Sequence, residues 1–175
     1  MKKEDYEFVS VSLLPDRGKS IVEFKEKVSI ITEDGEIEER WFKNSITPSV
    51  FPSDDLLIAI RKLSRIYAFQ CGKKINDETF KLESLLHPDA IGVRVTFFSI
   101  KKDDRKVNYC IKGLLREPSG HYNKYAPKEL DEAARLFYDV SDELPSLAEN
   151  ISDECYQWIT AKKYDNYGIQ KLWDD

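Results

Sequence analysis

The sequence has few of the residues that build disulfide frameworks or zinc sites. Its three cysteines, Cys71, Cys110 and Cys155, are widely separated and odd in number, which favours a reducing compartment over paired disulfides. Neither histidine, His87 or His121, stands at metal-ligand spacing from a cysteine or from a pair of carboxylates. We therefore expect neither a metal site nor another cofactor.

Long apolar runs and repeats are missing as well. No stretch is apolar enough to cross a membrane, and the N-terminus turns acidic at once where a signal peptide would be apolar. The chain also has no repeat that would indicate a solenoid or propeller. These features predict a cytoplasmic protein without a membrane partner. Its 175 residues, of which 41% are hydrophobic, are enough for one domain with a real core.

Charge is distributed unevenly along the chain. Residues 101–128 carry eight basic and three acidic side chains, whereas residues 129–175 carry four basic and twelve acidic ones, within a net charge of −5. A local basic region can meet phosphates even when the whole molecule is acidic. The basic segment is therefore the first place to look for a binding site.

Residues 1–47 have the pattern of an antiparallel β meander. Alternating apolar and polar residues predict strands over 6–14, 20–32 and 37–46. The Asp34-Gly35 pair indicates a tight hairpin turn between the last two strands. A break in the alternation near Lys27 predicts a bulge in the second strand.

Residues 53–71 form the clearest predicted helix. Ser53 is a suitable N-cap, and Asp54 and Asp55 follow it in the first turn, where the helix dipole favours acids. Apolar residues then recur at helical spacing until Gly72, a typical helix end.

Residues 91–116 predict a β-hairpin that is followed by a loop over 117–126. Alternation places one set of apolar side chains on a shared face and a polar set on the other. The apolar set is Ile91, Val93, Val95, Phe97, Val107, Tyr109 and Ile111; the polar set is Arg94, Thr96, Asn108 and Lys112.

Residues 127–164 predict a helical pair. The first helix begins at Pro127, Pro145 interrupts, and the second helix runs from about Ser146 to Lys163. A tail over 165–175 completes the chain. The predicted fold class is α+β: an antiparallel sheet of about five strands, with one central helix and the C-terminal helical pair on one face.

Cations and rings alternate in the basic segment, and this mixture is typical of single-strand binders. Cations follow the phosphates of a nucleic-acid strand, and flat rings stack on its bases. The alternative is a solvated loop whose tyrosines pack on the sheet edge. The candidate residues are Lys112, Arg116, His121, Tyr122, Lys124, Tyr125 and Lys128.

The end of the chain leaves a second binding hypothesis open. Single-strand-binding proteins often recruit partners through an acidic end with an aromatic residue, and Trp173, Asp174 and Asp175 form a short version of such an end. The alternative is that Trp173 docks on the core and the acids are solvated.

Two residue sets keep an enzymatic interpretation open. Asp16, Glu23 and Lys25 match a metal-dependent nuclease pattern, in which carboxylates hold a hard cation and a lysine steadies the attacking water. The commoner explanation of Glu23 and Lys25 is a solvated strand face. Cys110 and His121 are candidates for a nucleophile pair, although an inert cysteine is commoner. Neither set is a complete motif, so we predict no catalytic residue.

Two further stretches carry a resemblance. Residues 91–113, which contain Val107-Asn108-Tyr109-Cys110-Ile111-Lys112-Gly113 and lead to 125–128, are the first. The second comprises 151–159, 162–163 and 170–173. In order and separation these pieces resemble uncharacterised proteins of tailed bacteriophages, over about half of the chain. The resemblance implies a phage or prophage protein of the bacterial host cytoplasm, encoded among replication and recombination genes. It implies no active residues.

Together these features predict a non-enzymatic phage accessory protein that binds single-stranded nucleic acid or a replication or recombination complex. One alternative is a phage-encoded inhibitor or adaptor that binds a host protein, for example in anti-defence, because the acidic C-terminal region could imitate nucleic acid. A small metal-dependent nuclease is the other. The expected partner is thus single-stranded nucleic acid or a host or phage protein, and a homo-oligomer stays open.

Overall fold

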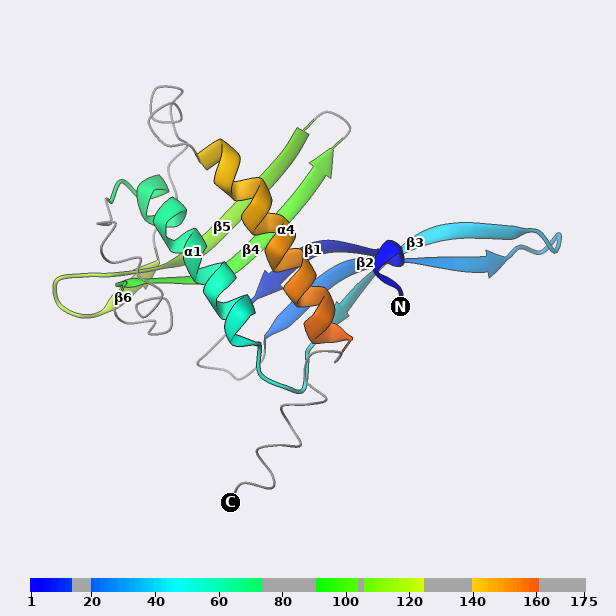
Figure 1. Cartoon of the computed structure of the whole chain (residues 1–175), viewed down its shortest axis with the longest axis horizontal. Coiled ribbons are helices and arrows are strands. Elements are labelled where there is room, and N and C mark those ends of the chain that lie inside the picture. The colour runs from blue at the N-terminus through cyan, green and yellow to red at the C-terminus, as the bar shows by residue number, and fades with distance from the viewer. Residues whose placement is uncertain (14–19, 74–90, 104–105, 125–139, 161–175) are drawn as a thin grey trace, which may run out of the picture.

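A six-stranded antiparallel sheet carries two helices on one face (Figure 1). The computed structural model describes residues 1–13, 20–73, 91–103, 106–124 and 140–160. The strand order is β3-β2-β1-β4-β5-β6. The strands are β1 (Tyr6–Ser12), β2 (Ile21–Ile31), β3 (Ile37–Ile46), β4 (Val93–Asp103), β5 (Lys106–Arg116) and β6 (Tyr122–Lys124); the helices are α1 (Asp54–Gln70) and α4 (Val140–Ile159), and a short 3-10 helix, η1 (Lys3–Asp5), precedes β1. The predicted α+β class is confirmed, with six strands instead of about five.

Strand β1 joins the predicted meander and the predicted hairpin into one sheet. It pairs with β2 through Tyr6 to Ser12 and with β4 through Ser10 to Ser12. Both predicted hairpins form, β2 with β3 and β4 with β5. At the first turn, Gly35 has φ +82°, the left-handed conformation that an Asp-Gly turn requires.

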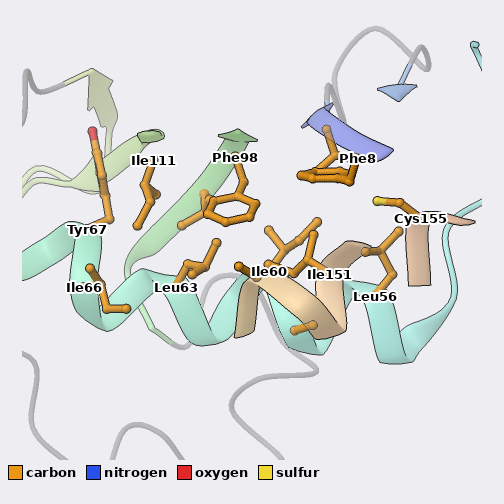
Figure 2. Close-up of a cluster of buried hydrophobic side chains, with 14 of the residues drawn as sticks. Phe8, Leu56, Ile60, Leu63, Ile66, Tyr67, Phe98, Ile111, Ile151 and Cys155 are labelled. Atoms are coloured by element: carbon orange, nitrogen blue, oxygen red, sulfur yellow. The ribbon is translucent and has the colours of Figure 1, made fainter. Parts of the chain in front are cut away.

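The core lies between the two helices and the sheet. In Figure 2, Leu63 of α1 lies beside Phe98 of β4, and Leu56 and Ile60 of α1 lie beside Ile151 of α4. All five side chains are buried. Burial on this scale supplies the main favourable term in folding.

The start of α1 is fixed as the sequence predicts. The Ser53 hydroxyl accepts a hydrogen bond from the Leu56 amide at 3.1 Å and donates one to Glu154 of α4 at 3.0 Å. Ser53 therefore caps α1 and ties it to α4. The other end of the helix is followed by Gly72, which has φ +75°, in agreement with the predicted stop.

Helix α4 differs from the prediction at Pro145. The proline was expected to separate two helices, but it lies inside α4, which runs from Val140 to Ile159. A proline removes one backbone hydrogen bond and costs a helix interior about 3 kcal/mol. Burial of Ile151, Cys155 and Trp158 in the core offsets this cost. The helix predicted from Pro127 and the tail over 165–175 lie outside the described residues.

The sheet contains two irregularities, and neither is at the predicted place. Strands β2 and β3 pair without a break past Lys27; the register shifts instead between Phe8 and Ser10 of β1. A second shift lies between Val95 and Phe97 of β4. Val22, Phe24, Val28 and Ile30 of β2 stay two or four residues apart on either side of Lys27 and so keep one facing, and nothing there requires a bulge.

The bulge in β4 changes which residues face the core. The sequence predicted Phe97 on the apolar face with Val95, but the extra residue at the bulge moves Phe97 to the opposite face. Phe98 takes the core position and is fully buried, whereas Phe97 stands opposite Lys112. One inserted residue reverses the facing of everything after it, because side chains alternate with a period of two.

Candidate nucleic-acid interface

The face of the sheet turned away from α1 and α4 collects the basic residues of β4, β5 and β6. On β5, Ile111 and Leu115 are buried under the helices, so their neighbours Lys112 and Arg116 point to the other face. Cross-strand partners share a face. Lys112 is opposite Phe97, Arg116 is opposite Tyr122, and Leu114 is opposite Lys124.

Four of the seven predicted site residues thus lie on one surface. They are Lys112, Arg116, Tyr122 and Lys124. Arg94, Phe97 and Lys101 of β4 have the same facing, because they stand opposite Leu114, Lys112 and Asn108. We call these residues the basic aromatic face: Arg94, Phe97, Lys101, Lys112, Arg116, Tyr122 and Lys124.

Two cations of the basic aromatic face lie over rings. The Arg94 guanidinium carbon is 4.1 Å from the centroid of the Tyr122 ring, and Lys112 Nζ is 4.8 Å from that of Phe97. Such contacts are worth about 0.5–1 kcal/mol at exposed sites. They restrict the orientation of both rings before any ligand arrives.

The electrostatics of the two halves of this sheet surface differ. On the half formed by β1, β2 and β3, lysines are matched by carboxylates. These pairs are Lys25–Glu7 at 3.1 Å, Lys27–Glu39 at 3.1 Å and Lys43–Glu23 at 3.3 Å. On the other half, Lys112, Arg116 and Lys124 are exposed and make no ion pair with any residue that the structure describes. Positive charge is therefore concentrated on the basic aromatic face.

His121 lies at the edge of this face, on the turn between β5 and β6. Its carbonyl oxygen accepts a hydrogen bond from the Glu117 amide at 2.8 Å, and Gly120 of the same turn has φ +87°. His121 is exposed. The predicted residues Tyr125 and Lys128 lie outside the described part of the chain, as do Trp173, Asp174 and Asp175 of the proposed partner-binding end.

Two features of this surface were missed from the sequence. Residues 117–126 were predicted to be a loop, but Tyr122 to Lys124 form β6 and pair with β5. A three-residue strand is too short to give a periodic signal, and edge pairing of this kind depends on the neighbouring strand. Phe97 was assigned to the core because the bulge beside it has no clear sequence signature. Arg94 was placed on the polar face but was not counted as a site residue.

The enzymatic sets do not form a site among the described residues. Glu23 accepts a hydrogen bond from Ser10 at 2.9 Å and pairs with Lys43, while Lys25 pairs with Glu7. Asp16 lies outside the described ranges. Within those ranges no three His, Cys, Asp or Glu side chains are placed to hold a metal ion.

The cysteine–histidine pair is also too far apart. Cys110 stands in the middle of β5, whereas His121 is beyond the Arg116 end of that strand. Arg116 lies six positions after Cys110 along the strand, so the two residues are about 20 Å apart. The two side chains cannot exchange a proton directly.

Comparison with known proteins does not indicate a function. No protein-family model, curated protein or solved structure matches the chain. No helix in the described segments is both long and apolar enough to pass through a bilayer. What the protein binds is therefore inferred from the side chains of the basic aromatic face.

Proposed function

We propose that the protein binds single-stranded nucleic acid on the basic aromatic face, as a non-enzymatic bacteriophage accessory protein that assists replication or recombination in the host cytoplasm. The observation that carries this proposal is the gathering of Lys112, Arg116 and Lys124 beside the rings of Phe97 and Tyr122. Cations and rings on one open sheet surface match the two needs of a flexible strand, which are charge neutralisation and stacking.

The dimensions of the surface suit a short length of strand. Lys112 and Arg116 are separated by four residues along β5, or about 13 Å, and β4 to β6 spans two strand spacings, or about 10 Å. This is room for a few nucleotides. The exposed cations are lysines and an arginine on a regular sheet, so we expect phosphate contacts and stacking with little preference for base sequence.

Duplex DNA is a poorer fit. Reading a duplex needs an element that enters a groove, such as a helix or a two-stranded ribbon. The ribbon that protrudes from this fold is the β2–β3 hairpin, whose turn carries Glu33, Asp34 and Glu36. These acids would meet the phosphates at the groove walls and oppose entry.

Titration of a fluorescently labelled oligonucleotide, followed by anisotropy, tests the proposal. We expect binding of single strands at low salt, weaker binding at moderate salt, and weaker binding of a duplex of equal length at both. Phosphate contacts strengthen as salt falls. A chain that binds no single strand at low salt would rule the proposal out.

An inhibitor or adaptor that binds a host protein, for example in anti-defence, is the second candidate. It is supported by the acidic region over 129–175, of which α4 exposes Glu143 and Glu149. An acidic helix can dock on a basic surface that normally meets nucleic acid. A pull-down from host lysate compares the full chain with a Glu143→Lys, Glu149→Lys variant. If both recover the same background proteins, the result counts against this function.

A further inference from the structure

Strand β3 forms an open edge of the sheet. Nine of its ten residues are exposed, and β2 is its neighbour on one side while the other side has no strand among the described residues. Every second residue of such an edge directs its N–H and C=O groups away from the sheet, where another strand can bind them. Figure 1 shows β2 and β3 extending as a two-stranded arm away from the helices.

The arm exposes an unusual number of large apolar side chains. β1 pairs with β2 only as far as Glu26, so among the described residues no third strand pairs with the rest of the arm. The exposed apolar residues of the arm and of the segment after it are Val28 (38%), Ile31 (78%), Ile37 (76%), Trp41 (47%), Phe42 (45%), Ile46 (38%), Val50 (43%) and Phe51 (89%). A cluster of this kind marks a surface that meets another macromolecule.

The edge lacks two of the devices that usually prevent pairing. Natural edge strands carry proline, a bulge, or charged side chains that repel a second strand. β3 contains no proline and pairs with β2 without a register shift. Its four charged residues are grouped by sign, with Glu38 and Glu39 before Arg40 and Lys43. An antiparallel copy of the same strand places the acidic part against the basic part.

We propose that two copies of the chain associate through their β3 strands, antiparallel and around a two-fold axis that passes between the two Trp41 residues. In this register Trp41 faces Trp41 of the second copy, and Glu39 faces Lys43 of the second copy. Arg40 faces the ring of Phe42 of the second copy. Each contact occurs twice, as a two-fold interface requires, except the one on the axis.

The charges select this register over its neighbours. Residues that stand opposite each other must point to the same face of the sheet, so the two-fold axis must pass through a residue position and not between two residues. An axis at Arg40 would place two arginines against each other. An axis at Phe42 would place Glu39 against Ser45 and Lys43 against Trp41. An axis at Glu39 would pair Glu38 with Arg40 but would also place two Glu39 side chains against each other. The Trp41 register sets opposite charges face to face without opposing like charges.

The ion pairs within each chain extend this pattern. Lys43 already contacts Glu23 at 3.3 Å, and Glu39 already contacts Lys27 at 3.1 Å. Adding the contact between Lys43 and Glu39 of the second copy gives a row of four side chains that alternate in sign across the interface. Like-charge neighbours are absent from this row.

Light scattering coupled to size exclusion tests the association over a range of loading concentrations. We expect a mass that rises from that of one chain, 20.4 kDa, towards twice that value. Glu39→Lys alone and Lys43→Glu alone should each raise Kd about tenfold, because two symmetry-related contacts become repulsive. Mixing the two variants should restore the dimer, because each then meets an opposite charge.

The matched control is Lys62→Glu, which reverses an exposed charge on α1, outside the arm. It should dimerise like the parent chain, and thermal unfolding should show that all variants are folded. A mass of one chain at every concentration overturns the inference. So does a dimer that Glu39→Lys leaves unchanged, or a mixture of the two single variants that stays monomeric. This inference does not depend on nucleic-acid binding.

Discussion

The salt dependence of binding should report how many cations of the basic aromatic face meet phosphates. Three of its cations, Lys112, Arg116 and Lys124, are exposed and make no ion pair with a described residue. For single strands, the slope of log K against log salt is about −0.7 for each phosphate neutralised, so these three contacts predict a slope of about −2.1. Raising salt from about 50 to about 200 mM should then weaken binding about 20-fold.

Replacing these three cations should flatten that slope. The variant Lys112→Gln, Arg116→Gln, Lys124→Gln removes all three contacts, which predicts a slope near zero and almost the same affinity over the whole salt range. These three side chains are exposed and make no ion pair with a described residue, so the fold should tolerate the change. Anisotropy titrations at four or more salt concentrations, on the order of 50–200 mM, give both slopes.

A control with the same loss of charge separates local contacts from the net charge of the molecule. Lys2→Gln, Lys25→Gln, Lys62→Gln removes three positive charges from outside the basic aromatic face. We expect this variant to keep the parent slope. If the two triple variants show equal slopes, the strand does not lie on this face and the reasoning is refuted.

Further outcomes follow from individual side chains. Tyr122→Ala should weaken single-strand binding by about 1–3 kcal/mol, while Tyr122→Phe keeps the affinity, because the ring and not the hydroxyl stacks on a base; equal losses would refute stacking. Gly113→Ala should lower the free energy of unfolding by about 3 kcal/mol in urea titrations, because its Cβ would lie 2.6 Å from a backbone oxygen of β4; an unchanged midpoint would contradict this packing. Ser53→Ala should cost about 1–2 kcal/mol in the same assay, and Ser53→Thr should recover most of it. Burial raises the pKa of the Cys155 thiol well above its usual range. At mildly alkaline pH a thiol reagent should therefore modify the exposed Cys110 first and reach Cys155 only on unfolding. Simultaneous modification of both cysteines would show that the core opens.

The packing at Gly113 couples the core to the basic aromatic face. Tyr67 of α1 donates a hydrogen bond from its hydroxyl to the Gly113 carbonyl at 2.8 Å. The absence of a Cβ at Gly113 lets the Tyr67 ring approach the strand, since a methyl group would lie 3.1 Å from a ring carbon. Gly113 directly follows Lys112. The helix on one face therefore helps to fix the strand that presents a cation on the other.

Local signals in the sequence were enough to predict the individual elements. Ser53 with two following acids, the Asp34-Gly35 turn and the two hairpins were all confirmed. Each of these features depends on interactions within a few residues along the chain, such as a cap, a turn conformation or a face period. The basic segment could be found for the same reason, because composition is visible without a fold.

Tertiary structure decided what those elements present to the outside. Pairing of β1 with β4, the bulge that turns Phe97 outward, and the addition of β6 together put Lys112, Arg116, Tyr122 and Lys124 on one surface. Packing of α4 on the core also let the helix continue through Pro145. These outcomes depend on contacts between residues far apart in the chain, and a shift of one residue reverses a strand's facing. The amino-acid sequence by itself thus determined which elements form and which segment carries the positive charge. The pairing of distant strands determined which side chains meet on one surface. That pairing depends on the tertiary structure, because it is set by the burial of a shared core.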